Sequence, residues 1–316
     1  MSYSSAPLLG ELGRGLVKGA AVWLKATDGV QSRAACFVPS KDVTGRGTVL
    51  LLPGRTEFIE KYADLILLLT QKGFAVAILD WRGQGLSDRI APDPRMGHVG
   101  RFSDYQLDID ALLTWLKHEG IAAPHVMFAH SMGGLIGLRS LYRDLGLKAA
   151  VFSAPMWGIQ MPVWRLPMAA VLSRLKQDLR LDFSYAPTTS PQNYVLTSQF
   201  AGNALTSDVM AWEKMQQIYG LDPAFALGGP SLRWVRRGLH EARKLMARPA
   251  PDLPIITALG SHEAIVRPDV IHKRMATWEG GRLDLYPNGR HELLWEAPAI
   301  RKDFLQRITE HFERFS

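Results

Sequence analysis

The chain has 316 residues and only one cysteine, Cys36. A single thiol cannot form an intramolecular disulfide, which excludes the small disulfide-stapled folds and favours a reducing compartment. The sequence also has no cluster of cysteine and histidine at the spacing of metal ligands. We therefore expect a site without a metal.

Long apolar runs and long runs of one charge are missing as well. Residues 1–30 contain no apolar stretch behind a basic start of the kind that signal peptides have. Nowhere do about 18 uncharged apolar residues follow one another, as a membrane-spanning helix requires. The net charge of +7 comes without a long run of basic residues, which argues against nucleic acid as a partner. The expected location is the cytoplasm.

The chain does contain a regular alternation of short apolar runs and longer amphipathic stretches. The apolar runs have the length of strands and lie at 47–52, 74–80, 125–129, 149–153, 253–259 and 282–286. Such an alternation is typical of a mainly parallel sheet covered by helices on both faces. Ahead of it, segments 21–25 and 33–38 flank a Thr-Asp-Gly turn and predict an antiparallel hairpin at the sheet edge.

The alternation stops between residues 155 and 250, where the sequence is rich in Trp, Met, Arg and Pro and mostly helical in period. It resumes after residue 250. This order favours an insertion between two strands over a second domain placed in tandem. The sequence therefore predicts an α/β core of residues 1–154 and 251–316, with a helical cap at 155–250.

Residues 129–134, Ala-His-Ser-Met-Gly-Gly, follow one predicted strand and precede a helical stretch. This pattern is typical of a nucleophile elbow, in which a serine stands on a sharp strand-to-helix turn between small residues. Ser131 is the candidate nucleophile, although Ala129 stands where the pattern usually begins with glycine. Patterns this short also occur by chance, so the rest of the chain must supply the partners.

A serine nucleophile needs a base and a carboxylate that orients this base. Among the nine histidines, His291 follows a late predicted strand at the expected place. His130 is expected to point to the other side of the elbow, and the other seven are interpreted as packing or surface residues. Glu263 lies in the loop after strand 253–259, which gives the chain order Ser131, Glu263, His291 expected for this architecture. Asp269 lies close by and is the alternative acid, since aspartate is the commoner residue there.

Ligands of an open α/β sheet bind beyond the carboxyl ends of its strands. The segment Pro53-Gly54-Arg55 follows the predicted strand 47–52 directly. The backbone N–H of Arg55 and that of Met132, which follows the nucleophile, would together form an oxyanion hole with two donors. The alternative is an ordinary loop between a strand and a helix.

Several motifs in register resemble the α/β-hydrolase superfamily and, within it, the serine hydrolases that include monoacylglycerol lipases and bacterial lysophospholipases. Beyond the elbow, these motifs are Pro53-Gly54-Arg55-Thr56-Glu57 with Tyr62, Asp80-Trp81-Arg82-Gly83-Gln84-Gly85-Leu86-Ser87, Gly97-His98-Val99, Gly260…Glu263…Val266 and His291-Glu292. The chain departs from the family pattern at Ala129 for Gly, Pro53 for His and Glu263 for Asp. None of these changes removes a chemical group that the mechanism needs.

The resemblance implies the α/β-hydrolase fold and a triad of Ser131, Glu263 and His291. It also implies an acyl-enzyme mechanism without a cofactor, acting on an ester of a lipid such as a lysophospholipid or a monoacylglycerol. Five further charged or glycine residues of the motifs and their surroundings are interpreted as structural: Asp80, Arg82, Gly83, Asp108 and Glu292.

The predicted cap holds eleven Lys or Arg and six Asp or Glu, so it supplies +5 of the net charge of +7. Its Trp and Met side chains suit an acyl chain, and a basic, Trp-rich surface suits peripheral contact with an anionic membrane at its inner face. Segment 162–168 is the candidate lid, and Arg233, Arg236 and Arg237 share one face if their segment is helical. The alternative is that most Trp and Met pack the cap against the sheet.

Two other functions stay open. A serine aminopeptidase, or a general esterase of small substrates, would use the same triad, but an aminopeptidase needs acidic residues in the cap to hold a free amine. A non-catalytic binding protein can share the fold, although such proteins usually lack a triad member.

Overall fold

The computed structural model describes residues 3–160 and 182–316. Its centre is an eight-stranded sheet in the order β1-β2-β4-β3-β5-β6-β7-β8. The strands are β1 (Gly19–Lys25), β2 (Gln31–Phe37), β3 (Thr48–Leu52), β4 (Ala75–Leu79), β5 (Pro124–His130), β6 (Ala149–Ser153), β7 (Ile255–Gly260) and β8 (Gly281–Tyr286). Every predicted strand is therefore confirmed, with ends that differ by at most two residues.

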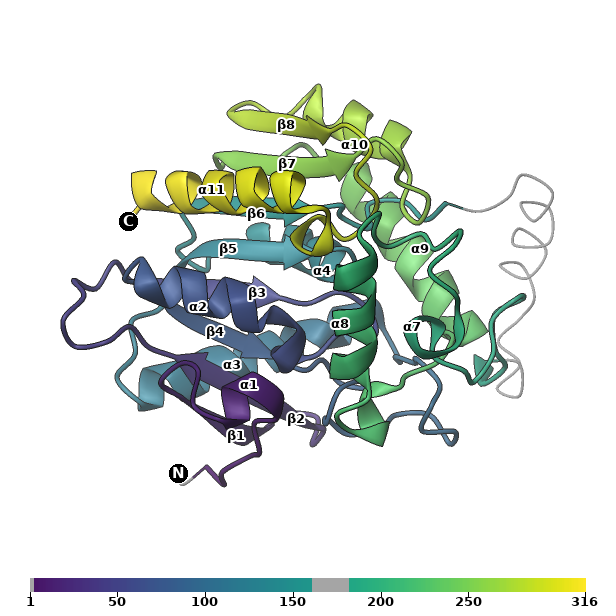
Figure 1. Cartoon of the computed structure of the whole chain (residues 1–316), viewed down its shortest axis with the longest axis horizontal. Helices are drawn as coiled ribbons and strands as arrows, with labels where there is room; N and C mark the ends of the chain where they lie inside the picture. Colours follow the sequence, from purple (N-terminus) through teal and green to yellow (C-terminus); the bar gives the residue numbers. More distant parts are fainter. Residues whose placement is uncertain (1–2, 161–181) are drawn as a thin grey trace.

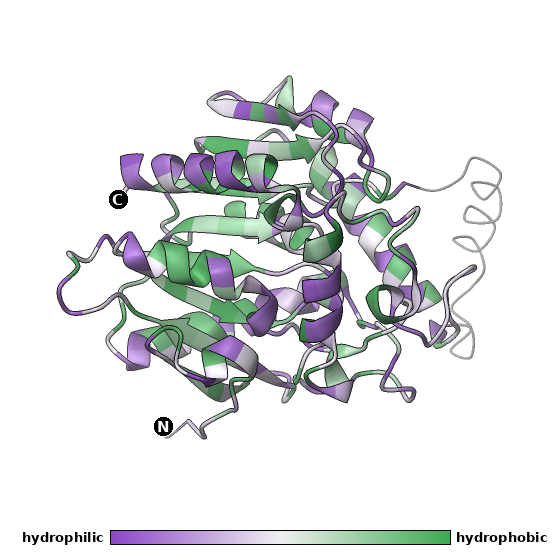
Figure 2. Cartoon of the chain, viewed as in Figure 1, coloured by the Kyte–Doolittle hydropathy of each residue, from purple (hydrophilic) through white to green (hydrophobic). Residues whose placement is uncertain are grey.

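The sheet is mixed at one edge and parallel elsewhere. Strand β2 pairs antiparallel with both β1 and β4, which confirms the predicted edge hairpin, and all other pairs are parallel. The inner strands are apolar throughout because helices cover both of their faces. Figure 2 shows this as green strands in the centre and purple on the surrounding helices.

Helices form a layer on each face of the sheet (Figure 1). One layer shares a buried cluster with the sheet and contains α1 (Gly10–Gly13), α2 (Ala63–Gln71) and α11 (Pro298–Arg314). The other layer contains α3 (Tyr105–His118), α4 (Met132–Leu141) and α10 (Pro268–Met275). This arrangement of layers and strand order is the α/β-hydrolase fold that the motifs predicted.

The interruption of the strand–helix alternation lies between β6 and β7, as predicted. Its described part contains α7 (Tyr194–Thr197), α8 (Val209–Tyr219) and α9 (Leu232–Met246), which lie beyond one end of the strands (Figure 1). The Asp208 and Ser231 side chains accept backbone N–H groups at the starts of α8 and α9, as N-caps do. The exact division into a core and a separate cap stays a prediction.

In the described part of this inserted region, most aromatic side chains pack against the core. Trp212, Met215 and Tyr219 form a buried cluster with Phe58 and Trp295 of the core. Trp157 and Trp234 are buried in the larger cluster around the sheet. The packing interpretation therefore applies to these residues, whereas the candidate lid 162–168 lies outside the described residues. No helix in residues 3–160 and 182–316 has the length and apolar character needed to cross a bilayer.

Candidate active site

Ser131 stands at the junction of β5 and α4 in a strained backbone conformation, with φ 48° and ψ −114°. Its N–H donates to Ser153 O over 3.0 Å, and Met156 N–H donates to Ser131 O over 2.8 Å. A Cβ at Gly133 would lie 2.2 Å from Leu52 O, so only glycine fits there. Ala129 lies inside the extended strand β5, and alanine therefore does not strain the elbow.

The structure brings Ser131, His291 and Glu263 together from three distant parts of the chain. The Ser131 hydroxyl lies 2.9 Å from Nε2 of His291, and Nδ1 of His291 lies 2.8 Å from Oε2 of Glu263. The other carboxylate oxygen of Glu263 accepts hydrogen bonds from the backbone N–H groups of Ile265 and Val266. His291 can thus accept a proton from Ser131 while Glu263 fixes the orientation and tautomer of its ring.

Burial alone would raise the pKa of Glu263, but the adjacent His291 and two backbone N–H donors hold that pKa below its ordinary value. Glu263 is therefore ionised at neutral pH. The alternative acid, Asp269, does not contact His291. It pairs with Arg267 over 3.0 Å, and its side chain is 62% exposed.

The loop after β3 is anchored on both sides of Arg55. Gly54 N–H donates to the Glu57 carboxylate, and Thr56 N–H donates to the Gln84 side chain over 3.3 Å. The Gln84 amide in turn donates to Gly54 O over 2.9 Å. On the other side of the elbow, Met132 begins α4, where backbone N–H groups have no acceptor within the helix. The N–H groups that the sequence predicts as oxyanion donors, those of Arg55 and Met132, belong to this loop and to this helix start.

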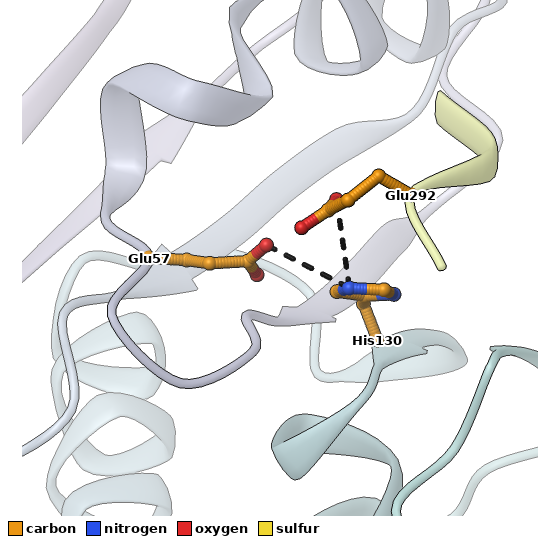
Figure 3. Close-up of side chains that lie close together, drawn as sticks. All are labelled: Glu57, His130 and Glu292. Carbon is orange, nitrogen blue, oxygen red and sulfur yellow. Dashed lines mark ion pairs between the residues drawn. The ribbon is translucent and has the colours of Figure 1, made fainter. Parts of the chain in front are cut away.

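A buried cluster of charges lies directly behind the catalytic candidates. Figure 3 shows Glu57 and Glu292 pointing toward the ring of His130, each from a different segment. The His130 Nε2 atom lies 3.7 Å from Glu57 Oε1 and 3.5 Å from Glu292 Oε2. Nζ of Lys61 lies 2.5 Å from Glu57 and 2.6 Å from Glu292. The ring centroids of His130 and His291 are 4.9 Å apart.

The cluster balances its charges internally. Burial would lower the pKa of His130, but Glu292 and Glu57 raise that pKa above its ordinary value, which favours the imidazolium. Burial would likewise raise the pKa of Glu292, but Lys61 and His130 bring it well below the ordinary range. The Nδ1 of His130 donates to Ser153 O over 3.1 Å. Two cations therefore compensate two carboxylates.

Glu57, His130 and Glu292 could also ligate a metal, since each offers one atom and these atoms lie within 4.8 Å of one another. The ammonium of Lys61 already occupies the space between both carboxylates. A divalent cation there would meet this positive charge at close range. The residues around the cluster thus fit a structural ion-pair network and do not fit a metal.

The remaining motif residues hold the loops around the site. Asp80 accepts the N–H groups of Ile59 and Leu86 over 2.9 and 2.8 Å, and Arg82 pairs with Asp108 over 2.8 Å. These contacts agree with a structural role. Nδ1 of His98 lies 2.8 Å from the hydroxyl of Ser231, the residue that caps α9, so this motif attaches the cap helix to the core.

A cavity of about 1610 Å³ opens at the triad candidates. Gly54, Arg55, Ser131 and His291 lie in its wall at the core end, and much of the remaining wall comes from the loop after β6 and from α9. Its volume exceeds the roughly 300–1,000 Å³ of typical small-molecule sites. The cavity can therefore hold an acyl chain together with a head group.

Sequence reasoning missed the part played by three residues. The sequence places His130 on the other side of the elbow from Ser131, but it does not show that the ring of His130 lies beside His291 and bridges two carboxylates. Glu57 and Lys61 carried a usable signal, because they lie four residues apart with opposite charges at the loop that holds the predicted oxyanion donor Arg55. Nothing in the sequence linked Lys61 to Glu292.

Known proteins resemble this chain over most of its length. The family described as serine aminopeptidase, S33, matches residues 44–298. Lysophospholipase L2 of Escherichia coli (strain K12) is 32% identical over 275 residues, which cover 84% of this chain and 80% of the relative. Probable lysophospholipase L2 of Haemophilus influenzae is 28% identical over 271 residues, which cover 84% of this chain and 83% of the relative.

Among solved structures, a soluble variant of monoglyceride lipase from Saccharomyces cerevisiae is similar with a TM-score of 0.72 and 20% identity, over 93% of this chain and 94% of that one. At that identity, the likeness shows the fold. The family match and the relative at 32% identity extend the likeness to the sequence itself. The chain therefore belongs to the serine aminopeptidase S33 family of α/β-hydrolases.

Proposed function

We propose that the protein is a serine hydrolase that cleaves carboxylic esters of lipids, with lysophospholipids or monoacylglycerols as substrates. The observation that carries the proposal is His291, which bridges Ser131 and Glu263 at 2.9 and 2.8 Å beside a cavity large enough for an acyl chain. The relatives support the substrate class, since two of them are named lysophospholipases.

In the first half of the reaction, Ser131 Oγ attacks the ester carbonyl carbon while its proton moves to Nε2 of His291. Glu263 accepts the N–H of the other ring nitrogen and stabilises the imidazolium. The negative oxygen of the tetrahedral intermediate accepts hydrogen bonds from the backbone N–H groups of Arg55 and Met132. The intermediate then collapses, and His291 returns the proton to the departing alcohol.

In the second half, water attacks the acyl group bound to Ser131, and His291 takes the proton of this water. A second tetrahedral intermediate forms in the same oxyanion hole. Its collapse releases the fatty acid and restores the Ser131 hydroxyl. Both halves use side chains, backbone N–H groups and water, and no step needs a cofactor.

We place substrate selection in a cap of residues 155–250 on a core of 1–154 and 251–316. Peripheral contact of this cap with an anionic membrane, on the cytoplasmic side, is part of the proposal. Its basis is the surplus charge of the cap and the helix α9, on which Arg233, Arg236 and Arg237 lie. Asp182 lies 3.3 Å from Arg233 and 3.6 Å from Arg236, and therefore offsets part of this charge.

The family description also names an aminopeptidase. The pairing of the acidic residues in the cavity wall argues against that activity. A free substrate amine would need an unpaired carboxylate. Among the described residues, each acid in the cavity wall already has a cation: Glu57 and Glu292 share Lys61, and Asp269 pairs with Arg267. A non-catalytic binding role is disfavoured because no triad group is missing.

Fluorophosphonate labelling tests the proposal, because this reagent reacts with activated serines. The expected result is one adduct that maps to Ser131, together with turnover of p-nitrophenyl esters and little turnover of aminoacyl anilides. The Ser131→Ala variant should take up no label. Its melting temperature should equal that of the wild type, which shows that the variant is folded. An unlabelled wild-type protein, or faster turnover of the anilides, would contradict the proposal.

A further inference from the structure

The side chain of Arg55 is a cation without a carboxylate partner in the wall of the cavity. Its Nη1 donates to Gly228 O over 2.8 Å, and its Cζ lies 5.8 Å from the ring centroid of Trp234. Among the described residues, no Asp or Glu forms an ion pair with it. In residues 3–160 and 182–316, the groups that offset its charge are a carbonyl oxygen and an aromatic ring.

The surroundings hold the Arg55 guanidinium in one place. A Cβ at Gly97 would lie 3.2 Å from Nη1, so the absent side chain of this glycine leaves room for the guanidinium. Gly228 and Trp234 line the same cavity as Arg55. Because the backbone of Arg55 is anchored on both sides, the guanidinium is positioned before any ligand arrives, and part of its planar fork of donors stays unused.

Burial without a carboxylate lowers the pKa of Arg55 to about 10, so the side chain remains charged at neutral pH. Lys61 shows the opposite situation close by. There, two carboxylates outweigh burial and raise the pKa above its ordinary value. The fold therefore compensates one cation near Ser131 and leaves the other available to an anion in the cavity.

We propose that Arg55 binds the phosphate group of a lysophospholipid whose acyl ester lies at Ser131, and that it makes the enzyme prefer lysophospholipids to neutral monoacylglycerols. The proposal rests on the ester hydrolase function proposed above. The backbone N–H of Arg55 would contact the ester carbonyl, and its side chain has a reach comparable to the glycerol that separates ester and phosphate. Arginine suits a phosphate because two parallel N–H groups can meet two oxygens.

The test compares lysophosphatidylethanolamine with 1-monoacylglycerol of the same acyl chain. Arg55→Gln keeps the backbone N–H and removes the charge, so the ratio of kcat/KM for the two substrates should fall about tenfold to hundredfold, the range for a charge-assisted hydrogen bond. Most of the loss should lie in KM, because the phosphate does not change during the reaction. Arg55→Lys, which keeps the charge without the fork, should fall between Gln and the wild type.

Lys244→Gln is the matched control. Lys244 lies on α9, is exposed and does not line the cavity, so this variant removes one positive charge from the same region. Its substrate ratio should change less than about twofold if long-range attraction is weak at physiological salt. An equal fall of the ratio in Lys244→Gln would mean that general charge, and not Arg55, selects the substrate, and would overturn the proposal.

A binding measurement separates the sources of the phosphate. In Ser131→Ala, which cannot cleave the ester, lysophosphatidylethanolamine and glycerophosphoethanolamine should bind, and adding Arg55→Gln should weaken both about tenfold or more. Inorganic phosphate alone should bind much more weakly than either. Binding of inorganic phosphate as tightly as the intact lipid would show a free anion site, contrary to the proposal.

These measurements separate the role of Arg55 from the hydrolase function. Turnover of both lipids with an unchanged ratio in Arg55→Gln would overturn the Arg55 assignment and leave the hydrolase function standing. Equal losses on both lipids would show that Arg55 acts only through the oxyanion loop. No turnover of either lipid by the wild-type enzyme would overturn the proposed function itself.

Discussion

The ammonium of Lys61 lies between two buried carboxylates, and its removal is the most direct test of the charge cluster behind the active site. Lys61→Met keeps a similar length and removes only the charge. The side chain of Lys61 is 2% exposed, and those of Glu57 and Glu292 are also buried. In the variant, His130 remains as a cation beside the two carboxylates, 3.7 Å from Glu57 and 3.5 Å from Glu292.

The loss of one partner from a buried ion pair costs about 3–5 kcal/mol. His130 still offsets one of the two charges, so we expect Lys61→Met to lose roughly 3 kcal/mol of unfolding free energy at pH 7.5. At about 2–4 °C per kcal/mol, the scale for domains of 150–250 residues, this corresponds to a melting temperature about 6–12 °C lower. Urea denaturation followed by fluorescence measures the free energy.

The loss should depend on pH. In the wild type, the pKa of Glu292 is well below its ordinary value, so the cluster contributes stability above the unfolded pKa of about 4.3 and loses it as pH falls through the folded pKa. Without Lys61, the folded pKa of a carboxylate rises, and the variant loses stability as pH increases. The difference between variant and wild type should therefore be larger at pH 7.5 than at pH 5.

Two further variants serve as controls. Lys72 lies at the end of α2 with a side chain that is 46% exposed, 3.8 Å from Glu313, so Lys72→Met should change stability by less than about 1 kcal/mol. Adding Glu292→Gln to Lys61→Met should restore at least about 1 kcal/mol, because it removes one uncompensated charge. If Lys61→Met were as stable as Lys72→Met, or if its loss did not vary with pH, the assignment of the cluster would be wrong.

Three predictions concern activity. Ser131→Ala should lower ester turnover by about 10⁶ with the fold intact; more than a few per cent of residual activity in purified variant would refute its role. Glu263→Gln should lower turnover by about 10⁴ and Glu263→Asp should also impair it, whereas Asp269→Asn should change it less than about tenfold; the reverse ranking would move the acid to Asp269. Activity on anionic vesicles should fall as salt shortens the Debye length from about 30 Å at 0.01 M to about 8 Å at 0.15 M, while p-nitrophenyl butyrate hydrolysis stays nearly constant. Neutralising Arg233, Arg236 and Arg237 of α9 together should remove this difference. A failure to co-sediment with anionic vesicles at either salt concentration would exclude membrane contact.

The strands and the order of the site residues could be predicted because both depend on local patterns. Parallel strands buried on two faces read as continuous apolar runs, as β3 and β4 do. The carboxyl ends of such strands meet at one edge of the sheet, so residues that follow them come together. This explains why the positions of Ser131, Glu263 and His291 in the chain predict that these three side chains lie close together, as they do.

The charge pairing could not be predicted, because its partners are far apart in the chain. Glu292 is 231 residues from Lys61, and no local pattern connects them. The arginines of α9 illustrate the same limit. Helical spacing correctly put Arg233 and Arg236 near each other, but it could not show that Asp182 lies between them or that Arg236 and Arg237 line the cavity. Helical periodicity predicts which side chains share one face of a helix, but it does not predict which residues that face contacts.

Lys61 and Arg55 show why pairing is more informative than net charge. A buried cation is stable only if something compensates it. Lys61 has two carboxylates, supplied by the loop after β3 and by the residue that follows His291, so its charge is already compensated. Arg55 has a carbonyl and a ring, which leaves an attraction that an anionic substrate group can satisfy. The net charge of +7 does not distinguish these cases, because exposed cations are screened by salt while a cation in a cavity wall is screened much less.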